Sequence, residues 1–140
     1  MIAAHNAARR RYGVAPLAWD NGLARDAENY ARQLARTNRF EHDRQAGRMP
    51  RQGENLFRGT RDAYSYADMI GLLVAEGQYF RRGVFPNVST TGNVSHVGHY
   101  TQIVWPTSQR VGCAVASNRA NDFLVCRYLP AGNVVGTLLR

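Results

Sequence analysis

Residues 98–108 read GHYTQIVWPTS, and this stretch decides the fold of the chain. His99 stands beside a tyrosine, a threonine and a glutamine, and an apolar run that ends at Trp105 follows them. A second block, LVCRYLPAGNV, occupies residues 124–134. The order and separation of the two blocks are much more specific than either block alone, so together they point to one family of domains.

The two blocks resemble the signature motifs of the CAP family, also called the SCP superfamily, which includes cysteine-rich secretory proteins, antigen 5 and pathogenesis-related proteins. The resemblance extends along nearly the whole chain, through segments 5–20, 23–31, 40–43 and 53–55 and through Glu76. It implies an α+β fold, a three-layer α-β-α sandwich with a central antiparallel sheet. Plant and animal members usually carry more than the two cysteines found here.

Length and composition limit the possibilities further. With 140 residues, of which 44% are hydrophobic, the chain is expected to form one domain over residues 1–140 with a substantial core. All 18 basic residues are arginines, and the formal net charge is +8. This charge favours an anionic surface as a partner without naming one, and no motif for a specific nucleic acid is present. The absence of lysine indicates a genome with GC-rich codon bias. The resemblance is expected to be to bacterial members of the family.

The predicted localisation comes from the resemblance. No apolar stretch approaches the ~20 residues of a transmembrane helix, and the first residues lack the apolar region of a signal peptide. Because members of the family are commonly secreted, we expect an extracellular or periplasmic protein whose signal peptide is absent from this sequence.

Local patterns predict three helices. Residues 3–12 are followed by Gly13, a residue type that is common just past a helix end. Asp20 is a suitable N-cap for a second helix over 21–36, in which apolar residues recur at helical spacing. A third helix is expected over residues 66–82, because apolar side chains there also recur on one face.

Two long polar segments separate these elements from the signature blocks. Residues 37–63 are glycine-rich and are predicted to be irregular, and residues 83–97 form a second loop. Loops this long inside a compact domain are usually functional. The second loop leads into the segment that carries His99, for which the resemblance favours a short helix that ends before Pro106.

The two cysteines lie on two predicted strands, 111–117 and 122–128, joined by a turn-rich segment. A hairpin centred between these strands places Cys113 directly opposite Cys126, close to the distance that a disulfide requires. Two buried free thiols are the alternative. An oxidising compartment, as expected for a secreted protein, favours the disulfide.

Four side chains are candidates for a functional cleft: His42, Glu54, Glu76 and His99. The resemblance implies that they face one another, whereas the sequence alone does not bring them together. Glu76 also stands out without the resemblance, because its neighbours one helical turn away are apolar. An ionised carboxylate in such surroundings needs a partner, a histidine or a metal ion, unless it lies at the boundary of the core and reaches solvent. For a single glutamate the solvent-exposed alternative would be preferred, but the position implied by the resemblance favours a partner.

Imidazole and carboxylate groups suit Zn²⁺ or another divalent metal. In that case His42 and His99 would be the ligands, and Glu54 and Glu76 would be further ligands or would orient the histidines. Without a metal, the same groups would form a structural hydrogen-bonded network, and the residue types do not decide between the two. No organic cofactor is expected. The nearby polar residues that we expect to line the pocket are Asn55, Tyr100 and Gln102.

Three functions are compatible with these features. The preferred hypothesis is a non-enzymatic binding module whose cleft takes a metal, a lipid, a sterol or another small ligand. The alternative is a metal-dependent, peptidase-like hydrolase with His42 and His99 as ligands and Glu54 or Glu76 as the catalytic base. For this hydrolase hypothesis, the sequence identifies no residue that would stabilise the oxyanion. A polyanion binder that uses only its arginines is the third hypothesis.

Overall fold

A four-stranded sheet forms the centre of the molecule, in a computed structural model that describes residues 1–140. Its strand order is β1-β4-β5-β2, and β2 is therefore an edge strand. A separate two-stranded ribbon pairs β3 with β6. The strands are β1 (Ala18–Trp19), β2 (Gly53–Thr60), β3 (Gly83–Val84), β4 (Arg110–Ser117), β5 (Asn121–Leu129) and β6 (Leu138–Leu139).

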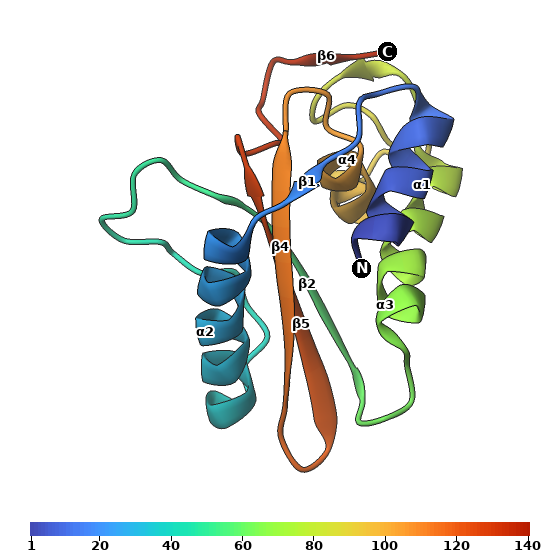
Figure 1. The fold of residues 1–140 in the computed structure, drawn as a ribbon. Coiled ribbons are helices and arrows are strands. Elements are labelled where there is room, and N and C mark those ends of the chain that lie inside the picture. The colour runs from blue at the N-terminus through green and yellow to red at the C-terminus, as the bar shows by residue number, and fades with distance from the viewer.

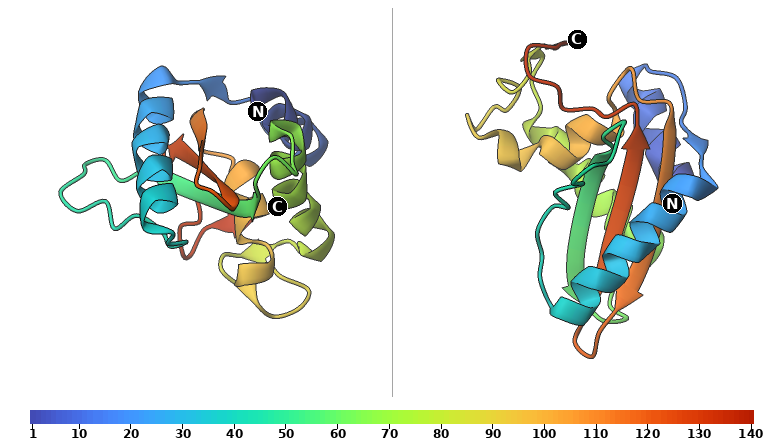
Figure 2. Two further views of the ribbon diagram at one scale, coloured as in Figure 1. Left: turned by 90° about the horizontal axis from the view of Figure 1, so that it is seen from below. Right: turned by 90° about the vertical axis from the view of Figure 1, so that its left-hand side faces the viewer.

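Helices cover both faces of the sheet. Helix α2 lies against one face, while α1, α3 and α4 lie on the other, which gives three layers (Figures 1 and 2). None of the helices has the length and apolar character needed to cross a bilayer. The helices are α1 (Ile2–Tyr12), α2 (Asn21–Thr37), α3 (Tyr66–Val74), α4 (Gly98–Ile103) and the 3-10 helices η1 (Ala75–Tyr79) and η2 (Val94–His96).

The alternation of residues along β5 explains why two helical layers form. Successive side chains of a strand point to opposite faces. Phe123 and Val125 belong to the hydrophobic cluster beneath α2, whereas Leu124 and Cys126 belong to the cluster beneath α1 and α3. All four are buried, so β5, an interior strand of the sheet, needs cover on both sides.

The predicted boundaries of the first two helices depend on local chemistry and are confirmed to within a residue. The Asp20 side chain accepts a hydrogen bond of 2.9 Å from the amide of Leu23 and caps α2. Gly13 ends α1 in the left-handed conformation, with φ of 99°, which glycine adopts at little cost. The short helix that carries His99 is also present, as α4.

Three predictions need correction. Residues 37–63 are not irregular throughout, because β2 lies within them and pairs along its whole length with β5. The long strands are antiparallel as expected, but β1 runs parallel to β4, so the sheet is mixed. The predicted helix over 66–82 is α-helical only as far as Val74, and Glu76 lies in the 3-10 continuation η1.

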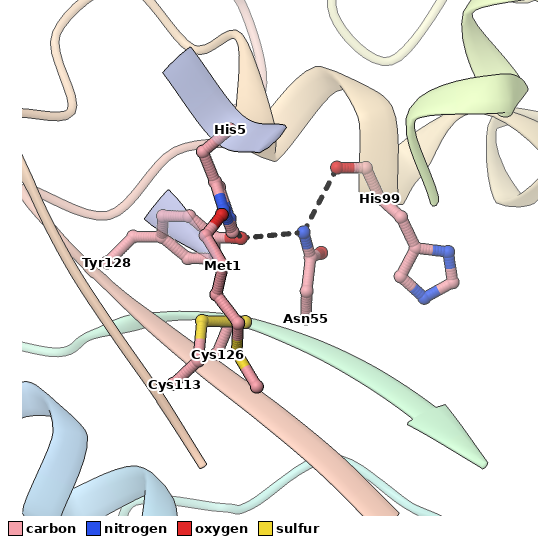
Figure 3. Close-up of a disulfide and its surroundings, with 7 residues drawn as sticks. All are labelled: Met1, His5, Asn55, His99, Cys113, Cys126 and Tyr128. Atoms are coloured by element: carbon pink, nitrogen blue, oxygen red, sulfur yellow. Dashed lines mark hydrogen bonds between the residues drawn. A yellow bond between two sulfur atoms is a disulfide. The ribbon is translucent and has the colours of Figure 1, made fainter. Parts of the chain in front are cut away.

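The predicted disulfide is present between adjacent strands. Cys113 and Cys126 are direct partners in the β4–β5 register, with Cα atoms 4.1 Å apart, and their sulfurs are bonded (Figure 3). The bond therefore closes a single hairpin and does not join one layer to another.

Helix α4 is anchored to α1 by a buried arginine. Arg9 is 1% exposed and its Nη1 donates to the carbonyl oxygens of Ile103 and Trp105, both at 2.9 Å, while Nη2 donates to that of Ser108 at 3.1 Å. These carbonyls lie at and just beyond the C-terminal end of α4, where a positive charge is favourable. Arg9 thus fixes the position of the helix that carries His99.

Candidate functional site

His42 is held by a carboxylate from the start of β2. Its Nδ1 lies 2.7 Å from Oε1 of Glu54, which also accepts a hydrogen bond of 3.0 Å from the amide of Asp43. The Glu54 side chain is only 5% exposed, whereas the His42 side chain is 66% exposed. An exposed imidazole is therefore oriented by a buried carboxylate, and its Nε2 is left without a protein partner.

His99 is held in the same manner by Glu76. Its Nδ1 lies 2.7 Å from Oε2 of Glu76. The other oxygen of this carboxylate accepts hydrogen bonds from the backbone amides of His99 (3.0 Å) and Tyr100 (3.2 Å). Because these amides open α4 and have no partner inside the helix, Glu76 also caps α4. One carboxylate therefore sets both the start of the helix and the orientation of the imidazole.

The two histidines line one small pocket of about 190 Å³. Glu54 and Asn55 are consecutive in β2 and leave opposite faces of the strand, yet both line this pocket. The pocket therefore lies at the open edge of the sheet. Glu76 does not line it but stands behind His99. The lining residues are His42, Glu54, Asn55, Ser95, Gly98, His99 and Asn133.

A larger polar pocket of about 400 Å³ adjoins the first and shares His42, Glu54 and Asn133 with it. Gln102 contributes to its wall, and the Oε1 of this residue accepts a hydrogen bond of 3.0 Å from the amide of Gly132. Of the three residues expected to line the cleft, Asn55 and Gln102 thus border the two adjoining pockets.

Tyr100 differs from the expectation that it lines the cleft. Its ring packs against that of Phe80, with ring centroids 5.6 Å apart, and covers Gly77. Consecutive helical residues point in directions about a quarter-turn apart, so Tyr100 points away when His99 faces the pocket. Burial raises the pKa of the Tyr100 hydroxyl.

A buried hydrogen-bonded chain supports the backbone at His99 (Figure 3). Asn55 Nδ2 donates to the carbonyl of His99 and to the hydroxyl of Tyr128, both at 3.1 Å. The Tyr128 hydroxyl lies 2.7 Å from His5 Nε2, and His5 Nδ1 lies 3.0 Å from the carbonyl of Met1. Since a carbonyl only accepts, Nδ1 carries a proton. Burial lowers the pKa of His5 to about 4, so the imidazole is neutral at pH 7 and Nε2 accepts from the tyrosine hydroxyl.

Arg127 is a site residue that the sequence analysis missed. It is 1% exposed, and it makes ion pairs of 2.8 Å with Glu54 and with Asp43. Its Nε and the Glu54 Oε2 are not aligned as a hydrogen bond, so charge attraction holds this contact. Burial favours the neutral form of Asp43, but the Gln45 amide and Arg127 outweigh it and lower the pKa of this carboxyl.

A signal for Arg127 exists in the sequence. The residue stands in the second signature block, within a strand whose flanking residues are apolar. A charged side chain at the centre of a strand buried on both faces needs a carboxylate partner. Glu54 is its direct partner in the β2–β5 register, and β2 was not predicted.

The donor set of the pocket suits a cation held by two histidines. Both Nδ1 atoms face carboxylates, so each ring would present Nε2, and histidine ligands of metals are commonly oriented in this way. These histidines and carboxylates do not form a closed site, because no three of their ligand atoms lie all within 4.8 Å of one another. Remaining positions would be filled by water, as in an open site.

Comparisons with known proteins assign the chain to a family. Pathogenesis-related protein 1B of Nicotiana tabacum is 42% identical over 136 residues, which span 96% of this chain and 76% of that protein. Pathogenesis-related protein 1 of Arabidopsis thaliana is 39% identical over 133 residues, which span 94% and 75%.

Among solved structures, NaASP2 with Zn²⁺ has the same fold, with a TM-score of 0.81 and 23% identity, over 98% of this chain and 80% of that one. Residues 2–128 match the family described as CAP, the cysteine-rich secretory protein family. With these relatives and this fold, the chain belongs to the CAP family.

Proposed function

We propose that the pocket between His42 and His99 binds a divalent cation, with Zn²⁺ as the preferred ion, and that the protein is a binding module. Members of the family, pathogenesis-related proteins among them, are secreted, which supports an extracellular setting. The observation that carries the proposal is the matched pair of histidines, each with Nδ1 against a carboxylate and both lining one pocket.

The chemistry of the donor set supports zinc. A neutral imidazole is a good ligand for Zn²⁺, and a carboxylate at its other nitrogen fixes the tautomer and strengthens the donor. NaASP2, which shares the fold, has been solved with this ion. When bound, the ion would supply a positive centre that attracts an anionic or carbonyl group of a ligand. The larger adjoining pocket offers space for such a ligand.

The roles of the glutamates favour binding over hydrolysis. A hydrolase needs a carboxylate that is free to take a proton from water. Glu54 is engaged by His42, by the Asp43 amide and by Arg127. Glu76 is engaged by His99 and by two amides of α4. Both carboxylates therefore hold other groups in place, and the peptidase-like alternative is not favoured.

Calorimetric titration with zinc tests the proposal. We expect binding of one ion per chain in the wild-type protein and loss of that binding in His42→Ala/His99→Ala. His96→Ala is the matched control, because His96 is exposed near the pocket but lies outside its lining. If the wild-type protein does not bind zinc, or if the double variant binds it equally well, the histidines and glutamates form a structural hydrogen-bonded network and the proposal is wrong.

A second candidate function is the binding of a small apolar ligand, such as a lipid. A groove of about 400 Å³ is lined only by hydrophobic residues from the N-terminus and start of α1, from β1 and β4, and from the start of α3. Such a composition is typical of sites for apolar ligands. The lining residues are Met1, Ile2, Trp19, Tyr66, Cys113, Ala114 and Val115.

The groove can be tested with a fluorescent fatty acid. Val115→Trp is expected to fill the groove and weaken binding by about tenfold or more, whereas His42→Ala is expected to leave it unchanged. Binding that does not saturate, or that is unaffected by Val115→Trp, would rule out this groove as the ligand site.

A further inference from the structure

The charged residues of the chain are unevenly distributed along the sequence. Nine of the ten aspartate and glutamate residues lie between residues 20 and 76, and the tenth is Asp122. Segments 1–19, 77–121 and 123–140 contain arginines and no aspartate or glutamate. A surface assembled from these three segments would therefore have no side-chain carboxylates to neutralise its positive charge.

The fold assembles such a surface at one end of the molecule. The C-terminal end of α1, the segment before β3 and the β3–β6 ribbon all lie at the top of Figure 1. Arg11, Arg81 and Arg82 are exposed in these segments, and no ion pair neutralises them. The rings of Tyr12 and Phe80 are in contact, with centroids 5.8 Å apart, and so connect α1 to the segment before β3.

The pKa shifts of two tyrosines also indicate that α1 and the segment before β3 lie close together. Burial raises the pKa of the Tyr12 hydroxyl, and the charge of Arg82 is close enough to oppose that rise. The charge of Arg11 acts in the same way on Tyr100, whose ring also packs against Phe80. The charges of Arg11 and Arg82 therefore both act on the aromatic cluster of Tyr12, Phe80 and Tyr100.

Apolar side chains are exposed beside these arginines. Val84 and Leu138 are direct cross-strand partners in the ribbon, so their side chains lie on the same face. They are 50% and 52% exposed, and Val135 in the adjoining turn is 75% exposed. The opposite face of the ribbon buries Leu139 in the cluster around Trp105. The ribbon is therefore anchored on one side and presents an apolar pair to solvent on the other.

We propose that this basic and apolar surface, formed by Arg11, Arg81, Arg82, Val84, Val135 and Leu138, docks onto an anionic phospholipid membrane. Such a membrane supplies both phosphate groups for the guanidinium groups and an acyl boundary for the apolar pair. A soluble polyanion would use only the arginines. The ribbon is too small to anchor the protein alone, so the two contributions act together.

Vesicle co-sedimentation tests this proposal, with vesicles of about 30% phosphatidylserine in phosphatidylcholine, against pure phosphatidylcholine. One arginine near an anionic surface contributes about 1 kcal/mol, which is about fivefold in partitioning. Arg11→Gln/Arg81→Gln/Arg82→Gln should therefore weaken binding about 100-fold. The matched control is Arg25→Gln/Arg36→Gln/Arg119→Gln, which has the same net charge but changes exposed positions on α2 and at the β4–β5 hairpin tip.

The apolar contribution needs its own variant. Val84→Ser/Leu138→Ser keeps every charge and is expected to reduce binding to the anionic vesicles by about tenfold. Equal losses in the two triple variants would show that only net charge matters. Unchanged vesicle binding by the serine variant, with tight binding of dextran sulfate, would identify a polyanion instead. Any of these results, or no binding to anionic vesicles, overturns the proposal.

Discussion

Replacement of Arg127 by methionine tests whether a buried cation holds the pocket together. Arginine and methionine occupy similar volumes, so the change removes charge more than volume. Arg127 makes 2.8 Å contacts with Glu54, with Asp43 and with the side-chain oxygen of Gln52. Without it, the Glu54 carboxylate would remain 5% exposed with no cation beside it.

The expected cost follows from this burial. Removal of one partner from a buried ion pair destabilises a protein by about 3–5 kcal/mol, because the other charge is left uncompensated. Asp43 is about 30% exposed and can regain water, so most of the cost should come from Glu54. A domain of this size has a free energy of unfolding of about 5–15 kcal/mol, so the change should remove a large fraction of it.

Denaturation by guanidinium chloride, followed by circular dichroism, gives the loss directly. Arg119→Met at the exposed hairpin tip is the control and should change the free energy of unfolding by less than about 0.5 kcal/mol. Adding Glu54→Gln to Arg127→Met should recover part of the loss, because the unpaired charge is then absent. A loss below about 1 kcal/mol for Arg127→Met, or no recovery in the double variant, would refute the reasoning.

Three further predictions concern stability. His5 has its pKa lowered from 6.5 to about 4 on folding, so it stabilises the fold fully above pH 6.5 and loses this contribution as the pH falls towards 4. His5→Gln should flatten the pH dependence of the free energy of unfolding by about 3 kcal/mol over this range, and an unchanged slope would contradict a neutral buried imidazole. Cys113→Ser/Cys126→Ser should cost about 3 kcal/mol in urea denaturation, since the bond closes a short loop, and a cost near zero would exclude this stabilisation. Gly53→Ala would place a methyl group against the buried amide of Gln102 and should cost about 1–3 kcal/mol, whereas a neutral result would mean that this amide moves freely.

The parts of the fold that local chemistry determines were predictable from the sequence. The cap at Asp20 and the glycine after α1 act within a few residues, and the β4–β5 hairpin pairs neighbouring strands. Strand β2 was missed because its partner β5 lies about 60 residues later in the chain. Local sequence patterns do not reveal a pairing over such a separation. Two glycines and several polar residues in Gly53–Thr60 also weaken its strand pattern.

The candidate site was predictable mainly through the family resemblance. For Glu76, only the position implied by the resemblance favoured a partner over exposure to solvent, and that partner is His99 together with two helix amides. The sequence alone did not place His42 beside Glu54, since this contact depends on a long loop folding back onto β2. Arg127 was missed for the same reason, because its need for a carboxylate becomes visible only once β2 and β5 are paired.

The double role of Glu76 has a consequence for how such a site evolves. Selection for a stable α4 alone would retain this glutamate, and with it an oriented His99, even in a descendant that no longer meets any metal. His42 has no such protection, because it is exposed and caps no helix. Loss of function in this lineage should therefore first appear as substitution at position 42, while position 76 remains unchanged.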